Sequence, residues 1–188
     1  MFSWIQSMDE AIQLFIQSSW HPAKILETIM IFITTLGDAG VFWIALGLVL
    51  LLIKKTRKAG ACMLAVLAVE FILGEGILKA IVKRPRPYTI FPEITMYVEK
   101  LNSYSFPSGH SMSSFACAAT LVQFHRPWGI VALVFAVLMA FSRVYLFMHW
   151  PSDVLCGALL GILVSLLVMK VIRLIAARLK EKHGKAAA

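Results

Sequence analysis

The chain has 188 residues and a formal net charge of +8, and 60% of its residues are hydrophobic while 15% are charged. A soluble domain has about 45–50% apolar and about 25% charged residues, and a globule this small cannot hide such an excess from water. The composition therefore excludes a soluble nucleic-acid-binding protein, a disordered chain and a disulfide scaffold, and it predicts an integral membrane protein.

The N-terminal segment, residues 2–17, is predicted to form an amphipathic helix. Its apolar residues recur at i, i+3 and i+4 spacing, and its polar residues take the other face. The apolar set is Ile5, Met8, Ile12, Phe15 and Ile16, and the polar set is Asp9, Glu10, Gln13 and Gln17. The segment is too polar to span. We expect it to lie along the membrane surface with Trp4 and Trp20 as anchors, the alternative being a helix packed on its own protein. It lacks a basic n-region, so no cleaved signal peptide is expected.

Six apolar segments follow, and they predict an all-α bundle of six transmembrane helices. The segments are Ala23–Leu36, Val41–Ile53, Ala59–Leu78, His110–Phe124, Trp128–Phe147 and Val154–Ala176. The third, fifth and sixth are long enough for a bilayer core of about 30 Å; the others are short and rely on snorkelling lysines and local thinning. We expect one domain over 1–188, with an interfacial helix (1–20), a six-helix core (23–176) and a basic cytoplasmic tail (177–188).

Basic residues in the loops predict the orientation. Lysines and arginines crowd the link between the second and third spans, and they crowd the C-terminal end. The positive-inside rule places these segments and both termini in the cytoplasm. The long 79–109 loop and the 149–153 link then face the other side of a cell membrane, where several basic residues break the rule and require an explanation. These exceptions are Lys79, Lys83, Arg84, Arg86, Lys100 and Arg143.

Three polar clusters lie at the predicted outer ends of the last four spans. The first, residues 79–87, holds four cations in eight residues, which suits a multiply charged anion or, as the alternative, lipid headgroups. The second, Phe106-Pro-Ser-Gly-His110, begins a predicted helix whose N-terminus favours anions. Taken without the other clusters, this segment is typical of a turn followed by a helix cap. The third pairs His149 with Asp153 four residues later, near Arg143, which can orient an imidazole or simply cap a helix.

Taken together, the clusters supply what phosphoryl transfer needs. They bring cations, a helix N-terminus, two histidines and a carboxylate to one membrane face. A two-histidine, one-carboxylate metal triad of His110, His149 and Asp153 is disfavoured, because the surrounding cations repel a divalent metal. A serine hydrolase triad of Ser108, His110 and Asp153 is disfavoured as well, because Ser108 lacks the G-x-S-x-G elbow.

The three motifs resemble those of the type 2 phosphatidic acid phosphatase superfamily, which includes acid phosphatases and vanadium haloperoxidases. The pattern K-x6-R-P, P-S-G-H and S-R-x5-H-x3-D is matched at every defining position. These positions are Lys79, Arg86, Pro87, Pro107–His110, Ser142, Arg143, His149 and Asp153. The resemblance covers roughly residues 23–175 and is specific, because three motifs occur in order. The resemblance points to the branch of this superfamily whose members are membrane proteins with six spans.

The resemblance implies a role for each residue. His149 attacks phosphorus and forms a phosphohistidine, Asp153 orients it, and His110 protonates the leaving oxygen and then activates water. The implied phosphate-binding groups are Lys79, Arg86, Ser108, Gly109 and Arg143. No metal and no cofactor is implied.

The expected substrate is a lipid phosphate whose tail stays in the bilayer, and the expected activity is that of a lipid phosphatase. Undecaprenyl diphosphate, a cell-wall carrier lipid, comes first; phosphatidylglycerol phosphate or phosphatidate of phospholipid metabolism is the alternative. Lys83 and Arg84 favour a diphosphate if they contact a second phosphate. Some dedicated undecaprenyl-diphosphate members carry Asp where this chain has Gly109, which leaves the substrate open.

Two carboxylates inside the third span are not part of the motifs. Glu75 lies four residues before Lys79 and is expected to pair with it and aim it. Glu70 is expected to be protonated or hydrogen-bonded in the bundle. A second class of function, a lipid-phosphate binding or transport protein without hydrolysis, uses the basic residues but leaves both histidines and Asp153 unexplained. The oligomeric state is not predicted.

Overall fold

The computed structural model describes residues 3–20 and 24–186. All regular elements in these ranges are helical, which confirms the all-α prediction. In chain order they are α1 (Ser3–Trp20), α2 (Lys24–Leu36), the 3-10 turn η1 (Asp38–Gly40), α3 (Val41–Leu52), α4 (Arg57–Phe71), the π-helical segment η2 (Ile72–Leu78), α5 (Lys79–Val82), α6 (Pro87–Ile90), α7 (Gly109–Phe124), α8 (Arg126–Tyr145) and α9 (Pro151–Ala186). Ala23, the outermost residues of the predicted domain and the side chain of Trp20 lie outside the described part.

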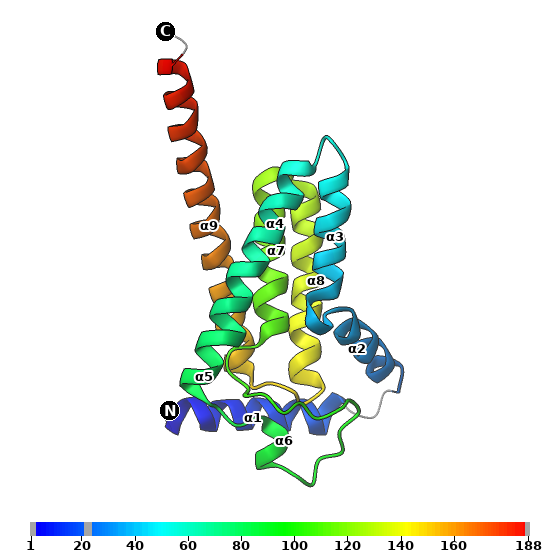
Figure 1. The fold of residues 1–188 in the computed structure, drawn as a ribbon. Coiled ribbons are helices and arrows are strands. Elements are labelled where there is room, and N and C mark those ends of the chain that lie inside the picture. The colour runs from blue at the N-terminus through cyan, green and yellow to red at the C-terminus, as the bar shows by residue number, and fades with distance from the viewer. Residues whose placement is uncertain (1–2, 21–23, 187–188) are drawn as a thin grey trace.

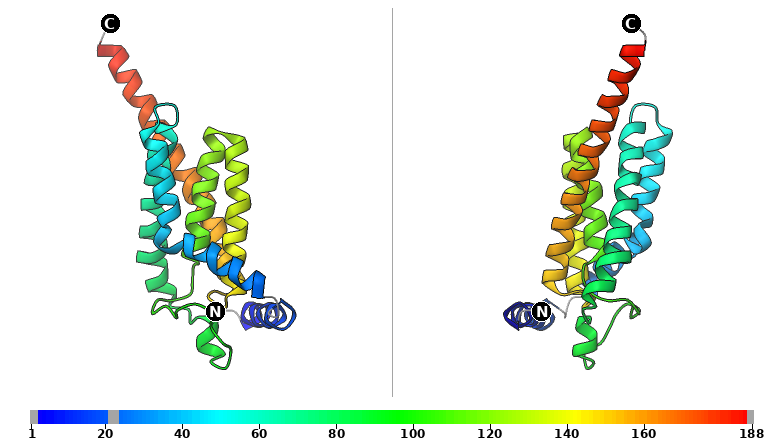
Figure 2. Two further views of the ribbon diagram at one scale, coloured as in Figure 1. Left: turned by 90° about the vertical axis from the view of Figure 1, so that its right-hand side faces the viewer. Right: turned by 60° about the vertical axis from the view of Figure 1, so that its left-hand side comes forward.

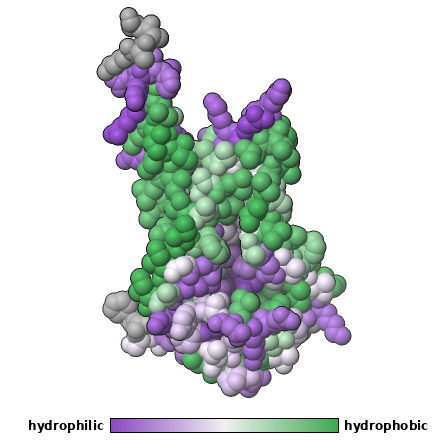
Figure 3. All heavy atoms as spheres, in the orientation of Figure 1, coloured by the Kyte–Doolittle hydropathy of each residue, from purple (hydrophilic) through white to green (hydrophobic). Residues whose placement is uncertain are grey.

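The bundle is built from α3, α4, α7, α8 and α9, which run side by side in all three views (Figures 1 and 2). Apolar side chains form a broad belt around its middle, and polar side chains gather at both ends (Figure 3). Within the described residues, the helical runs Arg57–Ile90, Arg126–Tyr145 and Pro151–His183 are long and apolar enough to cross a membrane. The chain is therefore a membrane protein with an apolar belt for the lipid.

The last four predicted spans lie in helical segments, although α9 continues to Ala186, past the predicted end at Ala176, and α7 is not among the candidate membrane spans of the described residues. α7 begins one residue before the predicted start, because the Ser108 hydroxyl accepts a hydrogen bond from the backbone N–H of Ser111 and caps it (3.4 Å). α8 and α9 begin earlier than predicted, α9 at Pro151, whose fixed φ suits the first helical turn. α8 ends at Tyr145, and Phe147 then takes a positive φ of 61°.

The structure does not show the first two predicted spans as two separate crossings. α2 and α3 meet at an angle of 47° across the η1 turn, so the chain bends there instead of reversing. Ala39 and Gly40 take positive φ values of 51° and 68°, which redirect the chain within three residues. The structure therefore does not confirm six spans. The bent pair is at most one crossing, and the described residues contain four candidate spans if it is counted so.

The largest buried side chain of the bundle, Trp43, packs where α3, α4, α7 and α8 meet. Its neighbours are Met63, Leu67, Cys117, Leu121, Ala132 and Ala136. The indole N–H donates to the Ser114 hydroxyl of α7 (2.9 Å), so the one polar atom of this ring is satisfied inside the apolar core. This contact ties α3 to α7, the helix that begins at the P-S-G-H motif.

Two glycines on α9 allow it to approach the start of α7. A Cβ on Gly157 would lie 2.7 Å from the Ser108 carbonyl oxygen, and one on Gly161 would collide with the Met112 carbonyl oxygen. The spacing is the small-x3-small pattern that brings membrane helices into backbone contact. The two glycines therefore set the distance between the second and third motifs.

Replacing Gly161 with alanine is expected to destabilise the fold strongly, because the added methyl group meets backbone and not a flexible side chain. We expect a loss of about 3 kcal/mol, or a fall in Tm of about 10 °C, measured by thermal unfolding in detergent. Gly76→Ala is the matched control, since a Cβ there meets nothing within 4 Å. Equal Tm values for the two variants would contradict this account of the α7–α9 contact.

The N-terminal helix α1 lies crosswise at the end of the bundle that also holds α6 and the 91–108 loop (Figures 1 and 2). The end of α9 projects from the opposite end of the bundle (Figure 1). This arrangement does not confirm the prediction that both termini lie on one side. The physical reason is the α2–α3 bend, where the chain does not reverse; α1 thus lies at the end where α9 begins, and α9 ends at the opposite end of the bundle.

Candidate active site

The three predicted motifs converge on one cavity of about 1190 Å³ at the α1 end of the bundle. It opens between η1 and α3 on one side and α4 and η2 on the other. The predicted site residues that line it are Glu75, Lys79, Arg86, Gly109, His110, Arg143 and His149. Apolar residues of α3 and α4 extend the same cavity toward the lipid belt, among them Ile44, Leu64 and Phe71.

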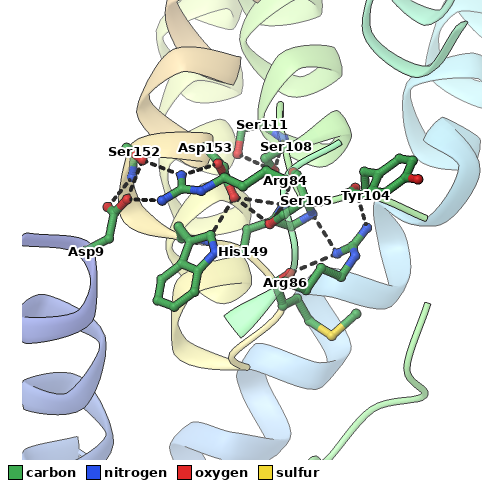
Figure 4. Close-up of polar contacts among 12 residues, drawn as sticks. Asp9, Arg84, Arg86, Tyr104, Ser105, Ser108, Ser111, His149, Ser152 and Asp153 are labelled. Carbon is green, nitrogen blue, oxygen red and sulfur yellow. Dashed lines mark hydrogen bonds and ion pairs between the residues drawn. The ribbon is translucent and has the colours of Figure 1, made fainter. Parts of the chain in front are cut away.

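His149 is buried, and its ring is oriented by the backbone (Figure 4). Its Nδ1 lies 2.7 Å from the carbonyl oxygen of Ser105. A carbonyl can only accept, so Nδ1 carries the proton and Nε2 keeps its lone pair. Nε2 lies 3.2 Å from Nη1 of Arg86, a cation at the wall of the cavity. This tautomer is the one that a histidine nucleophile requires.

Asp153 does not hydrogen-bond to His149 directly, which corrects the expected carboxylate–imidazole contact. Its Oδ2 lies 3.9 Å from Nδ1, and the Ser105 hydroxyl lies between them. That hydroxyl donates to Asp153 (2.5 Å) and lies 3.5 Å from Nδ1 of His149. The second carboxylate oxygen accepts from Arg84 (2.6 Å). Asp153 therefore reaches the histidine through Ser105, a residue that the motifs do not include.

The surroundings of His149 predict how activity depends on pH. Burial lowers the pKa of His149 well below its usual 6.5, and the positive charges of Arg86, Arg143 and Lys79 lower it further. A lowered pKa keeps the imidazole neutral, and so able to attack, when the pH falls below 6.5. We expect the acid limb of kcat/KM, corrected for ionisation of the substrate phosphate, to have its midpoint below pH 6.5. A midpoint above 6.5 would contradict this description of the site.

His110 is held by the turn between α2 and α3. Its Nε2 lies 3.2 Å from the Thr34 carbonyl oxygen and 3.1 Å from a carboxylate oxygen of Asp38. Both partners accept, so Nε2 carries a proton. A Cβ on Gly37 would lie 2.5 Å from the His110 ring, so the glycine makes room for it. The bend that replaces a predicted span thus forms one wall of the site.

The three cations predicted to bind phosphate line the cavity from different elements. Lys79 pairs with Glu75 (2.6 Å), the i,i+4 contact that the sequence predicts. Arg86 donates to the carbonyl oxygens of Ser103 (2.7 Å) and Met148 (2.8 Å). Arg143 is buried and donates to the Thr34 hydroxyl, while its Nε has no hydrogen-bond partner within the described residues. These contacts hold the three side chains in place and leave their N–H donors at the wall of the cavity.

In the P-S-G-H motif, Gly109 and His110 line the cavity, whereas Ser108 caps α7. Gly109 lines the cavity, and a Cβ there would lie 2.7 Å from a carboxylate oxygen of Glu75. Glycine thus leaves room for Glu75 and exposes backbone at the start of α7. Ser108 is buried, and its hydroxyl accepts from Ser111 Oγ (3.0 Å) instead of lining the cavity. Its predicted phosphate contact stays a prediction.

Arg84 and Lys83 do not support the predicted second phosphate site. Arg84 is buried and forms ion pairs at 2.6 Å with Asp9 and with Asp153, so its charge is already balanced. Lys83 is exposed and takes a left-handed conformation at the end of α5. Neither residue lines the cavity. Of the four cations in residues 79–87, Lys79 and Arg86 line the cavity, whereas Lys83 and Arg84 do not.

Sequence reasoning missed several polar residues around the site. Ser105, Asp38, Thr34 and Asp9 contact site residues, although they lie outside the three motifs. Asp38 lies in the Gly37-Asp-Ala-Gly40 segment between the first two predicted spans, where a carboxylate between glycines is a sequence signal for a polar contact. Among the described residues, no set of three or more histidine, cysteine, aspartate or glutamate side chains is arranged to hold a metal ion, so the metal triad does not assemble. The serine triad does not assemble either, because the Ser108 hydroxyl contacts Ser111.

Comparisons with known proteins identify the family. Residues 56–175 match the model of the PAP2 superfamily. The chain belongs to the PAP2 superfamily. The match contains all three motifs, whereas α1, α2 and η1 precede it, so the PAP2 model covers neither Asp9 nor Asp38.

Individual PAP2 relatives resemble most of the chain. An undecaprenyl-diphosphatase from Sulfolobus acidocaldarius is 32% identical over 167 residues, or 88% of this chain and 80% of the relative. Phosphatidylglycerophosphatase B from Bacillus subtilis is 34% identical over 182 residues, 87% of this chain and 83% of the relative. The crystal structure of a transmembrane PAP2-type phosphatidylglycerolphosphate phosphatase from Bacillus subtilis superimposes with a TM-score of 0.74 at 34% identity, covering 93% of this chain and 89% of that one.

Proposed function

We propose that this protein is a membrane lipid phosphatase that removes a phosphate from an isoprenoid or glycerolipid phosphate or diphosphate. One observation carries the proposal. His149 presents the unprotonated Nε2 toward a cavity lined by three cations, and this cavity continues between apolar side chains of α3 and α4. Phosphoryl transfer depends on a positioned nucleophile and on positive charge around the phosphate oxygens, and the proposal assigns these roles to His149 and to the three cations.

The proposed reaction has two steps. Nε2 of His149 attacks the terminal phosphorus and a P–N bond forms. The bond from that phosphorus to the leaving oxygen breaks, and His110 gives this oxygen a proton; it is the lipid oxygen of a monophosphate or the bridging oxygen of a diphosphate. Water then attacks the phosphohistidine, His110 takes a proton from the water, and the P–N bond breaks to release inorganic phosphate. Lys79, Arg86 and Arg143 stabilise the charge on the phosphate oxygens in both steps. Asp153 acts on His149 through Ser105. No metal ion takes part in this scheme.

Undecaprenyl diphosphate is the first substrate to test, because the Sulfolobus relative is named for it and matches most of the chain. Phosphatidylglycerol phosphate is the second candidate, and one structural observation favours it. The cavity presents cations for a single phosphate, since Arg84 is paired with two carboxylates and Lys83 lies outside the lining. The Bacillus phosphatidylglycerophosphatase resembles the chain to a similar degree.

We place the active site on the extracytoplasmic side of the cell membrane. The opposite end of the bundle carries the basic 54–58 link and the basic end of α9, which the positive-inside rule keeps in the cytoplasm. The N-terminal helix then lies on the active-site side. Labelling of single cysteines introduced at Glu93 and at Lys182 with a membrane-impermeant reagent tests this: Glu93 should react from outside the cell, and Lys182 should react after lysis.

The deciding experiment is phosphate release by purified protein in detergent with EDTA present. Undecaprenyl diphosphate, phosphatidylglycerol phosphate and phosphatidate are offered in parallel at equal concentration. Release that persists in EDTA supports the metal-independent scheme, and the ranking of kcat/KM names the substrate. Folded protein that releases no phosphate from any of the three lipids would overturn the proposal in favour of lipid-phosphate binding or transport.

A further inference from the structure

The N-terminal helix turns its polar face inward. Asp9 is 3% exposed and Gln13 is fully buried, whereas the apolar face is open to the surroundings. The exposed apolar side chains include Trp4, Met8, Ile12 and Phe15. An amphipathic helix at a membrane surface normally gives its polar face to water. Here the polar face of α1 packs against the rest of the protein. The polar residues of α1 therefore have partners that the family motifs do not explain.

The inward face of α1 contacts the segment that carries His149. The Gln13 amide donates to the carbonyl oxygen of Val144 (2.6 Å), just before the 146–150 link. Oδ1 of Asp9 accepts from the backbone N–H of Ser152 (2.9 Å), and Oδ2 accepts from its hydroxyl (2.5 Å). Ser152 is the second residue of α9, so Asp9 serves as an N-terminal cap for a helix that lies 143 residues further along the chain.

Asp9 is also joined to Asp153 through Arg84 (Figure 4). Nη2 of Arg84 contacts Asp9 and Nη1 contacts Asp153, both at 2.6 Å. The guanidinium stacks 5.3 Å from the centre of the Trp150 ring, which limits how it can move. Ser105 then connects Asp153 to His149. Charge-assisted hydrogen bonds therefore run from α1 through Arg84 and Asp153 to Ser105, the residue whose carbonyl oxygen orients the proposed nucleophile.

We propose that Asp9 is a positioning residue for phosphoryl transfer, and that α1 completes the active site by fixing Arg84 and the start of α9. The inference rests on the proposed function, because it assumes that His149 is the nucleophile. Two carboxylates hold one buried guanidinium, so removing the charge of Asp9 leaves Arg84 with Asp153 as its single anionic partner in this arrangement. Asp153 and the 149–153 link then lose their fixed position, and small misplacements of reacting groups are costly.

The test compares Asp9→Asn with Glu10→Gln, which removes the same charge from the next residue of the same helix. Glu10 accepts from the Gln6 amide (2.9 Å), and a glutamine there keeps an accepting oxygen. For Asp9→Asn we expect kcat to fall by about 10- to 100-fold with KM within about twofold of wild type. Glu10→Gln should keep both constants. Asp9→Glu, which restores the charge one methylene further out, should recover part of kcat.

A second readout separates positioning from loss of folded protein. Without the Asp9 charge, the positive charge of Arg84 is less balanced, so the acid limb of kcat/KM should move to lower pH in Asp9→Asn but not in Glu10→Gln. Fewer folded molecules would lower the rate and leave the limb in place. If Asp9→Asn does not fold, Gln6→Ala replaces it, because Gln6 accepts from Arg84 (2.8 Å) and carries no charge.

The outcomes distinguish this inference from the proposed function. Wild-type protein that releases phosphate while Asp9→Asn matches Glu10→Gln in kcat and in pH profile would overturn the positioning role alone. Wild-type protein that releases phosphate from none of the lipids would overturn the proposed function. A fall in kcat with a shifted acid limb, partly recovered by Asp9→Glu, supports both.

Discussion

Replacing His149 with alanine is expected to abolish phosphate release, with kcat falling by at least about 10,000-fold. The structure gives the reason in two parts. The Ser105 carbonyl fixes the proton on Nδ1, and Nε2 is left unprotonated beside Arg86 at the cavity wall. A lowered pKa keeps this nitrogen neutral at physiological pH, so no proton must leave before it attacks phosphorus. The measurement is steady-state phosphate release from the best lipid substrate.

His125→Ala is the matched control for this variant. His125 lies between α7 and α8 at the opposite end of the bundle from the proposed site, so its loss should leave kcat and KM unchanged. Thermal unfolding of both variants establishes that they are folded. If His149→Ala kept more than a few percent of the wild-type rate, His149 would not be the nucleophile, and His110 would be the next residue to examine.

Replacing Arg143 with lysine is expected to lower kcat/KM by about 100- to 1,000-fold although the charge is kept. Arg143 is fully enclosed between Thr34 and the cavity, and its Nε is unpartnered within the part of the chain that is described. A guanidinium offers several donors in one plane, so it can bind Thr34 and phosphate at once. A lysine has a single nitrogen, which cannot reach both positions with the same geometry.

Arg126→Lys is the corresponding control, because Arg126 begins α8 at the far end of the bundle and is exposed. It should leave kcat/KM within about twofold of wild type. Inorganic vanadate, as a transition-state mimic, should inhibit Arg143→Lys more weakly than wild type by a similar factor. Equal inhibition of the two proteins would mean that Arg143 does not contact the phosphate.

The long apolar helices could be predicted from sequence because hydropathy and caps act locally. α7, α8 and α9 begin at Gly109, Arg126 and Pro151, each within three residues of the predicted start. The direction of the chain between α2 and α3 could not be predicted. Helices of 13 and 12 residues on either side of a short turn are compatible with two short spans or with a single bent span. The positive φ values at Ala39 and Gly40 bend the chain there, and the sequence does not show them.

The site was predictable where its residues lie in compact motifs and not where its partners come from distant segments. Glu75 and Lys79 pair as the helical spacing predicts. Nothing local shows that Arg84 would face two carboxylates instead of a phosphate, because Asp9 lies 75 residues before it and Asp153 lies 69 residues after it. Ser105 was missed for the same reason: its hydroxyl meets Asp153 only when the 91–108 loop folds over the start of α9.

The wide sequence separation of the α1 contacts has a consequence for biosynthesis. α1 is made before its partners Val144 and Ser152, which lie 131 and 143 residues further along the chain than Gln13 and Asp9. Membrane helices enter the bilayer in order as the chain is made, and contacts between distant segments form last. Arg84, another partner of Asp9, is made earlier, but the contact of Asp9 with Ser152 cannot form until α9 has begun to be synthesised. A chain that ends before α9 therefore carries the first two motifs but lacks His149, Asp153 and the contact between α1 and the start of α9.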